Sequence, residues 1–119
     1  MKLKNKVAIV TGGGKGIGEE ICLGLAKEGA KIVIADLDKE NSSNVIKTII
    51  QNGSDAIYVE TNVSNEQSVK NLISETLKQF KQIDILINNA GIRHVKKLED
   101  HSLNDWNDMI SVNLTGPYI

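Results

Sequence analysis

Several features are scarce in this 119-residue chain, and each scarcity excludes a class of protein. Cys22 is the only cysteine, so no disulfide framework can form within the chain. The 14 basic and 15 acidic residues give a net charge of −1, which offers no reason to expect nucleic acid or an anionic membrane as a partner. No apolar run has the length of a membrane span or a signal peptide. We therefore expect a soluble, cytoplasmic protein.

Metal and thiol chemistry are also poorly represented. The two histidines, His94 and His101, have no third ligand at a fitting spacing, so the sequence predicts no metal site. Cys22 stands in a helical pattern among apolar residues. We interpret it as a small buried hydrophobic residue rather than a reactive thiol.

The chain does have a regular alternation of strand and helix patterns. Short apolar runs predict strands at 7–10, 32–35, 56–59 and 85–87. These runs are continuous rather than alternating, so each strand should be buried on both faces, as in a parallel sheet covered by helices.

Helical periodicity fills the intervals between the predicted strands. Helices are expected over 16–27, from about Lys39 to a stop at Gly53, from a capping box at 64–67 to Phe80, and from near Ser102. The expected fold is α/β, a Rossmann-type doubly wound parallel sheet that is incomplete, with about four strands. Residues 1–119 should form one NAD(P)-binding domain, truncated at its C-terminus.

The glycine-rich stretch 11–18 follows the first predicted strand and opens the first helix. It fits T-G-x-x-x-G-x-G; the spacing G-x-G-x-x-G is not met, and Lys15 lacks the following Ser or Thr of an NTPase phosphate loop. Such glycines let backbone N–H groups and a helix N-terminus approach a phosphate. The alternative is a strand-to-helix turn without a ligand, which the entropic cost of so many glycines disfavours.

Three further motifs follow in order along the chain. Asp36 ends the second predicted strand, 88–91 (N-N-A-G) follow the fourth, and 106–116 read W-x-x-M-I-x-V-N-L-T-G. Together with the glycine stretch, these motifs identify a resemblance to the short-chain dehydrogenase/reductase family over the whole chain. The resemblance implies a nicotinamide cofactor bound by Thr11, Gly12, Gly14, Lys15, Gly16, Ile17, Gly18, Asp36, Leu37, Asn62, Val63, Asn89, Ala90 and Gly91.

Two of these positions bear on which cofactor is bound. Asp36 can accept hydrogen bonds from ribose hydroxyls and would repel a 2′-phosphate, which argues for NAD over NADP. Lys15 argues the other way, because relatives that use NADP often have a basic residue there. We give Asp36 more weight, since a lysine can swing to solvent. Asp36 could instead cap the following helix, although Asp38 could also fill that role.

Two asparagines take their expected roles from the resemblance. Asn62 stands where the family usually has an aspartate that contacts the adenine amino group, with Val63 beside the ring. Asn62 could equally be an Asn-turn that closes the third strand. Asn113 shares a predicted helical face with apolar residues, where an unpaired amide is costly. The resemblance makes it a catalytic residue that holds a water in the proton relay, and Asn88 a brace between central strands.

The remaining catalytic residues of the family are not in this sequence. The family uses a serine and the tyrosine and lysine of Y-x-x-x-K, and neither Tyr58 nor Tyr118 begins that motif. We therefore expect an oxidoreductase relationship, with hydride transfer between a nicotinamide cofactor and a hydroxyl or keto substrate, but an inactive 119-residue chain. The alternative is a non-catalytic nucleotide-binding fragment.

Substrate and assembly are only weakly indicated. The stretch from Gly91 to Asp100 is similar to 3-hydroxybutyrate dehydrogenases, with Arg93 able to pair with a substrate carboxylate. The loop length also fits 3-ketoacyl-carrier-protein reductases and sugar dehydrogenases. The resemblance further implies a small-molecule substrate and a homo-oligomer.

Overall fold

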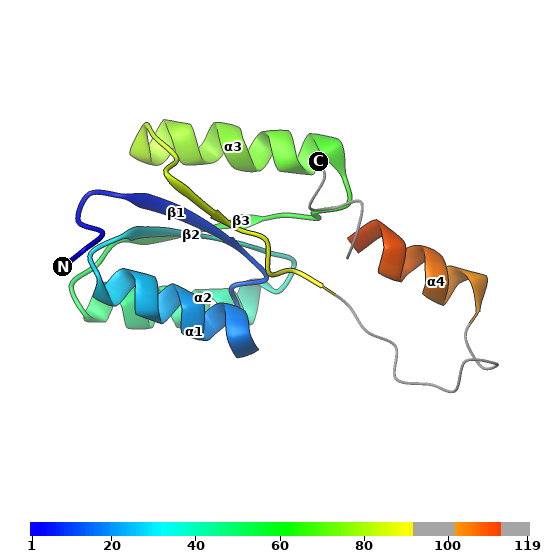
Figure 1. The fold of residues 1–119 in the computed structure, drawn as a ribbon, viewed down its shortest axis with the longest axis horizontal. Helices are drawn as coiled ribbons and strands as arrows, with labels where there is room; N and C mark the ends of the chain where they lie inside the picture. The colour runs from blue at the N-terminus through cyan, green and yellow to red at the C-terminus, as the bar shows by residue number, and fades with distance from the viewer. Residues whose placement is uncertain (92–101, 113–119) are drawn as a thin grey trace.

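The structure, a computed structural model, describes residues 1–91 and 102–112. Within these ranges strands and helices alternate as the sequence predicts (Figure 1). In chain order they are β1 (Val7–Thr11), α1 (Gly16–Lys27), β2 (Lys31–Asp36), α2 (Lys39–Gln51), β3 (Ala56–Glu60), α3 (Glu66–Phe80), β4 (Ile85–Ile87) and α4 (Leu103–Ile110).

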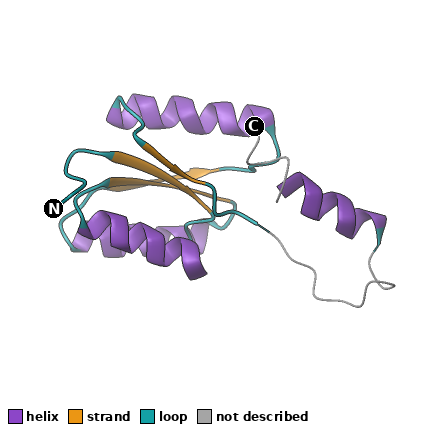
Figure 2. Ribbon diagram, viewed as in Figure 1, coloured by secondary structure: helices purple, strands orange, loops and turns teal. Residues whose placement is uncertain are grey.

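The strands form one parallel sheet in the order β3-β2-β1-β4. The chain builds outward from β1 to β2 and β3, then crosses to the other side of β1 to add β4. Helices α1 and α2 cover one face of the sheet, and α3 covers the other (Figure 2). The predicted parallel Rossmann-type sheet is therefore confirmed, and β1 lies at the point where the strand order reverses.

Each face of the sheet contributes its own apolar core, because successive side chains of a strand point to opposite faces. Ala8, Val10 and Ile34 pack toward α1 and α2, together with Cys22 of α1. The alternate residues of the same strands, Ile9 among them, pack toward α3. Both sets are buried, which is why β1 and β2 read as continuous apolar runs.

The prediction that every strand is buried on both faces is wrong for β4. Ile85 and Ile87 are half-buried, and the side chain of Leu86 is 54% exposed although it pairs in register with buried Ile9. The reason is position: β4 is the edge of the described sheet, and no described helix covers Leu86 as α3 covers Ile9.

The helix starts agree with the sequence except at α3. Asn65, not Ser64, is the N-cap of α3, and its side chain accepts a hydrogen bond from the backbone N–H of Ser68. The predicted capping box at 64–67 is therefore wrong. Its serine is otherwise engaged, because the Ser64 hydroxyl donates to Oδ1 of Asn62 at 2.6 Å. A reciprocal capping box does open α4, between Ser102 and Asp105, where the last helix was expected.

Candidate functional site

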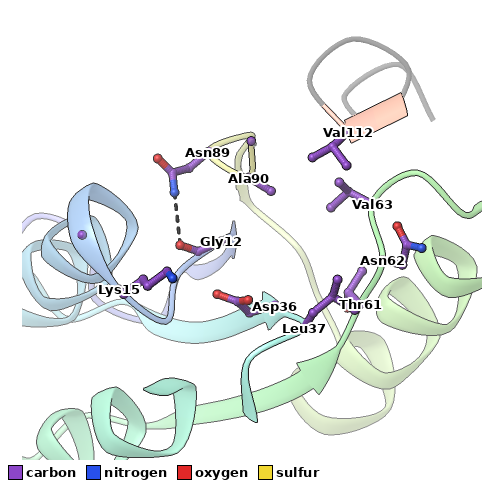
Figure 3. A pocket seen from close by; sticks show the side chains of 12 residues that line it. Gly12, Lys15, Asp36, Leu37, Thr61, Asn62, Val63, Asn89, Ala90 and Val112 are labelled. Carbon is purple, nitrogen blue, oxygen red and sulfur yellow. Dashed lines mark hydrogen bonds between the residues drawn. The ribbon is translucent and has the colours of Figure 1, made fainter. Parts of the chain in front are cut away.

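A cavity of about 370 Å³ opens at the carboxyl ends of the strands (Figure 3). This is where ligands bind in open parallel α/β sheets, beside the strand at which the order reverses. The cavity is lined by Gly12, Lys15, Gly16, Asp36, Leu37, Thr61, Asn62, Val63, Asn89, Ala90, Gly91 and Val112.

The glycine-rich turn brings the start of α1 to this cavity. Gly12 and Gly16 both have the left-handed backbone conformation, with φ of +66° and +59°, that side chains disfavour. A Cβ atom on Gly16 would meet nothing within 4 Å, so this backbone is open on that side. Lys15 is the N-cap of α1 but makes no side-chain capping bond. The first-turn N–H groups of α1 are thus left without a side-chain cap, a favourable arrangement for an anion.

Gly18 holds α1 against the turn behind the cavity. A Cβ atom there would overlap the carbonyl oxygen of Gly12 and would lie 2.6 Å from Nδ2 of Asn89. Real Cβ atoms essentially never approach backbone so closely. Gly18 therefore acts through close packing, and it does not itself line the cavity.

Asp36 ends β2 with both carboxylate oxygens engaged. Oδ2 accepts from the backbone N–H of Gly14 and Oδ1 from that of Asp38, each at 3.0 Å. Asp36 does not cap α2; Asp38 does, accepting from the Asn41 N–H at 3.0 Å, and this bond lowers the pKa of Asp38 below its usual value. Asp36 is thus held at the cavity wall, with its remaining lone pairs available to a ligand.

Thr11 links the ends of β1 and β4. Its hydroxyl accepts from the N–H groups of Asn89 and Ala90, each at 2.9 Å, and donates to the Ile87 carbonyl at 3.3 Å. The side-chain amide of Asn89 donates to the Gly12 carbonyl at 3.2 Å, and Figure 3 shows this bond along the side of the cavity that Gly12 lines. The Asn89 amide thus ties the segment after β4 to the turn after β1, while Asn88, expected to brace the central strands, directly follows β4 and is exposed.

The opposite wall of the cavity follows β3. Oδ1 of Asn62 accepts from the Ser64 N–H at 3.0 Å and from the Ser64 hydroxyl at 2.6 Å. The Asn-turn that was one of two interpretations is thus present. It fills both lone pairs of this oxygen, so only the amide nitrogen of the side chain stays available to a base. An adenine contact at Asn62 remains a prediction.

Most of the predicted cofactor residues line this one cavity, and the exceptions have a physical reason. Thr11, Gly14 and Gly18 support the wall from behind through the contacts described above. Ile17 lies outside the cavity lining, on the helix surface, with 75% of its side chain exposed.

Two lining residues were not predicted from the sequence. Thr61 is buried at the end of β3, and its N–H donates to the Asp36 carbonyl at 3.1 Å. Its position directly before Asn62, a predicted site residue, was the sequence feature that could have indicated its place in the cavity lining. Val112 directly precedes Asn113, a predicted site residue. Asn113 itself, Arg93 and His94 lie outside the described residues.

The described residues hold neither a metal-binding cluster nor a membrane-spanning helix. In ranges 1–91 and 102–112, no three His, Cys, Asp or Glu side chains are grouped as a metal would require. No helix within those ranges has the length and apolar character needed to cross a membrane.

Cys22 should be unreactive in the folded chain. Its side chain is fully buried, as predicted, and its thiol lies 3.8 Å from the Gly13 carbonyl. Burial, followed by the charges of Glu19 and Asp36, raises the pKa of the thiol to about 12. Because the thiolate is the nucleophile, we expect alkylation near neutral pH about a thousandfold slower than for a free cysteine. Mass spectrometry of iodoacetamide-treated protein, native and in guanidinium chloride, measures this; equal rates would contradict it.

The fold and this cavity define a class of protein. Three features are those of a Rossmann-type nucleotide-binding domain: a glycine turn that leads into an uncapped helix, an acid at the end of the neighbouring strand, and a cavity where the strand order reverses. The sequence matches the short chain dehydrogenase family over residues 6–119. The chain therefore belongs to the short-chain dehydrogenase family.

Comparison with sequence relatives shows that the chain corresponds to the N-terminal part of the proteins of that family. An uncharacterized oxidoreductase of Thermotoga maritima is 43% identical over 117 residues, covering 98% of this chain and 46% of that protein. A 3-oxoacyl-[acyl-carrier-protein] reductase of Synechocystis is 42% identical over 118 residues, covering 98% of this chain and 48% of that protein. The chain thus spans about half the length of the curated relatives it matches.

Solved structures agree closely with the fold. A short-chain dehydrogenase/reductase from Burkholderia phymatum, in complex with NAD, superposes with a TM-score of 0.93 at 34% identity, covering 99% of this chain and 42% of that one. A 3-ketoacyl-(acyl-carrier-protein) reductase from Brucella melitensis, complexed with NADH, gives a TM-score of 0.91 at 38% identity, covering 98% of this chain and 47% of that one.

Proposed function

We propose that this chain forms the cofactor-binding part of an NAD-dependent oxidoreductase that transfers a hydride between the nicotinamide and a hydroxyl or keto substrate. The observation that carries the proposal is the Asp36 carboxylate, held at the cavity wall by the Gly14 and Asp38 N–H groups beside the uncapped start of α1. One end of this arrangement suits a diphosphate and the other a ribose diol.

Each part of the dinucleotide has a matching surface in this proposal. The pyrophosphate lies against the open backbone at Gly16, where the dipole of α1 favours negative charge. The adenosine ribose lies on Asp36, and the base lies between Leu37 and Val63, whose apolar side chains line the same cavity. Gly91 and Val112 mark the other end of the cavity, where the second half of the dinucleotide would continue.

The nicotinamide supplies hydride transfer when it is bound, and the 119 residues supply its binding. For the substrate we propose a 3-ketoacyl or 3-hydroxyacyl compound, as in 3-hydroxybutyrate. Two observations support this class: Arg93 offers a cation for a carboxylate, and two relatives are named as reductases of 3-oxoacyl or 3-ketoacyl groups on acyl-carrier protein.

A second candidate is a nucleotide-binding domain without catalysis of its own. The observation in its favour is that the sequence contains no Y-x-x-x-K motif. In this case the cavity would bind NAD without turnover. A binding measurement alone does not separate the two candidates; turnover in the activity assay described below would favour the first candidate, whereas its absence fits both.

Cofactor choice tests the role of Asp36. We expect the chain to bind NAD more tightly than NADP, and Asp36→Ala to narrow that gap about tenfold, because the carboxylate repels a 2′-phosphate. Calorimetric titration of both cofactors measures the ratio. Asp36→Asn retains a hydrogen-bond acceptor without the charge, and exposed Asp55 at the opposite end of the sheet provides the control Asp55→Ala. Equal or tighter binding of NADP to the unchanged chain would mean that Lys15 governs selection.

A further inference from the structure

Ser42 is the one buried polar side chain in the described part of the chain that lacks a hydrogen-bond partner. It lies in the first turn of α2, its side chain is fully buried, and no group bonds to its hydroxyl. A buried hydroxyl without a partner is normally destabilising. Because the Ser42 hydroxyl makes no hydrogen bond, hydrogen bonding does not explain why a serine stands here. The size and the location of its side chain are the properties left to explain it.

Ser42 lies directly behind the glycine-rich turn. A Cβ atom on Gly14 would be 2.7 Å from the Ser42 hydroxyl oxygen and 2.9 Å from Oδ2 of Asp36. Gly14 is thus fitted between these two side chains, with no room for a methyl group. The same closeness fixes the direction in which the Gly14 N–H points, toward Asp36 at 3.0 Å.

The groups around Gly14 are not free to retreat. The carbonyl of Asp36 accepts from the Tyr58 hydroxyl at 2.9 Å and from the Thr61 N–H at 3.1 Å, so its main chain is tied to β3. The start of α2 is tied by the Asp38 cap, and Asp38 in turn donates its N–H to Asp36. If the atom behind Gly14 grows, Gly14 is the part that must move.

We propose that Ser42 is a positioning residue for cofactor selection, acting through Gly14 on Asp36. Its small side chain lets Gly14 sit close enough to hold the Asp36 carboxylate toward the cavity. A larger side chain displaces Gly14 and removes one of the two N–H groups that hold that carboxylate, which can then turn away from a 2′-phosphate. The inference rests on the proposed NAD site and adds a residue outside the cavity lining to the control of NAD against NADP.

A size series at this position tests the inference in the 119-residue chain. Ser42→Ala removes the hydroxyl group. Ser42→Cys replaces the hydroxyl oxygen with a larger sulfur atom, and Ser42→Thr keeps the hydroxyl and adds a methyl group. We expect the NAD/NADP affinity ratio of Ser42→Ala to match the unchanged chain. We expect Ser42→Cys and Ser42→Thr to lower the ratio about threefold to tenfold although Asp36 is intact. Calorimetry gives the ratio, and circular dichroism confirms that each variant is folded.

The outcomes separate this inference from the proposed function. A ratio that stays constant across the size series, in folded variants that bind NAD, would overturn the role of Ser42 and leave the NAD site in place. A fall in Ser42→Ala as large as in Ser42→Thr would also overturn it, because the hydroxyl rather than its size would then matter. Binding of neither cofactor to the unchanged chain would overturn both proposals. Should Ser42→Thr fail to fold, Ser42→Cys alone decides, since it keeps the shape of the side chain.

Discussion

Replacing Gly18 with alanine should lower the affinity for NAD roughly 100-fold or more. The new methyl group would overlap the Gly12 carbonyl and lie 2.6 Å from Nδ2 of Asn89. Neither group can move without a large energetic cost, because the Gly12 carbonyl is part of the main chain and the Asn89 amide is hydrogen-bonded to it. The start of α1 would be pushed away from the turn. The backbone N–H groups that are expected to hold the pyrophosphate would then no longer point toward it. Calorimetric titration with NAD measures the loss.

Gly24 provides a matched control in the same helix. It lies on the exposed side of α1, and a Cβ atom there would meet nothing within 4 Å. Gly24→Ala should keep the NAD affinity and raise the free energy of unfolding by about 0.5–1 kcal/mol, because alanine restricts the unfolded chain and favours helix. NAD binding by Gly18→Ala at the level of Gly24→Ala would show that the close approach of α1 to Gly12 is unimportant.

The second large effect is on turnover: the 119-residue chain should not oxidise or reduce any substrate with NAD or NADH. General acid–base catalysis contributes about 10²–10⁴-fold to such rates, and the tyrosine that supplies it in the family is absent. Tyr58 cannot replace it. Its hydroxyl donates to the Asp36 carbonyl at 2.9 Å, and burial together with nearby acids raises its pKa.

An absorbance assay of NADH against hydroxy acids, alcohols and ketones tests this expectation. Gly16→Val is the reference, because a branched side chain at a φ of +59° should disrupt the turn. Cofactor-dependent turnover above that reference would contradict the expectation and would favour an unrecognised proton donor in the chain. Its absence, combined with NAD binding, is the result that both proposed roles of the chain share.

Periodicity and turn chemistry made the fold predictable, since they are local properties of a sequence. The start of α2 follows from the capping acid Asp38. The end of α1 follows from Gly29, which has a φ of +98°. The cap of α3 was misplaced because Ser64 and Asn65 both suit it. Only the three-dimensional turn at Asn62 shows that Ser64 is already engaged.

The site was predictable where a motif places a residue on the cavity wall, as at Asp36. It was not predictable where a residue acts through contacts between distant segments. Nothing local in the sequence indicates that the Thr11 hydroxyl meets the chain at Asn89, or that Ser42 lies behind Gly14. Such contacts depend on which strands become neighbours, and the sheet order sets that.

The place of β1 between β2 and β4 also bears on when the site can form during folding. The bonds from Thr11 to the end of β4 join residues 76 to 79 positions apart, whereas β2 follows β1 after a single helix. Closing so long a loop costs more entropy than closing a short one, and non-local pairings slow folding. The glycine turn and Asp36 can therefore come together early, on β1 and β2 alone. The wall formed by Asn89 and Ala90 must wait for β4, which makes this end of the cavity the last to acquire its shape.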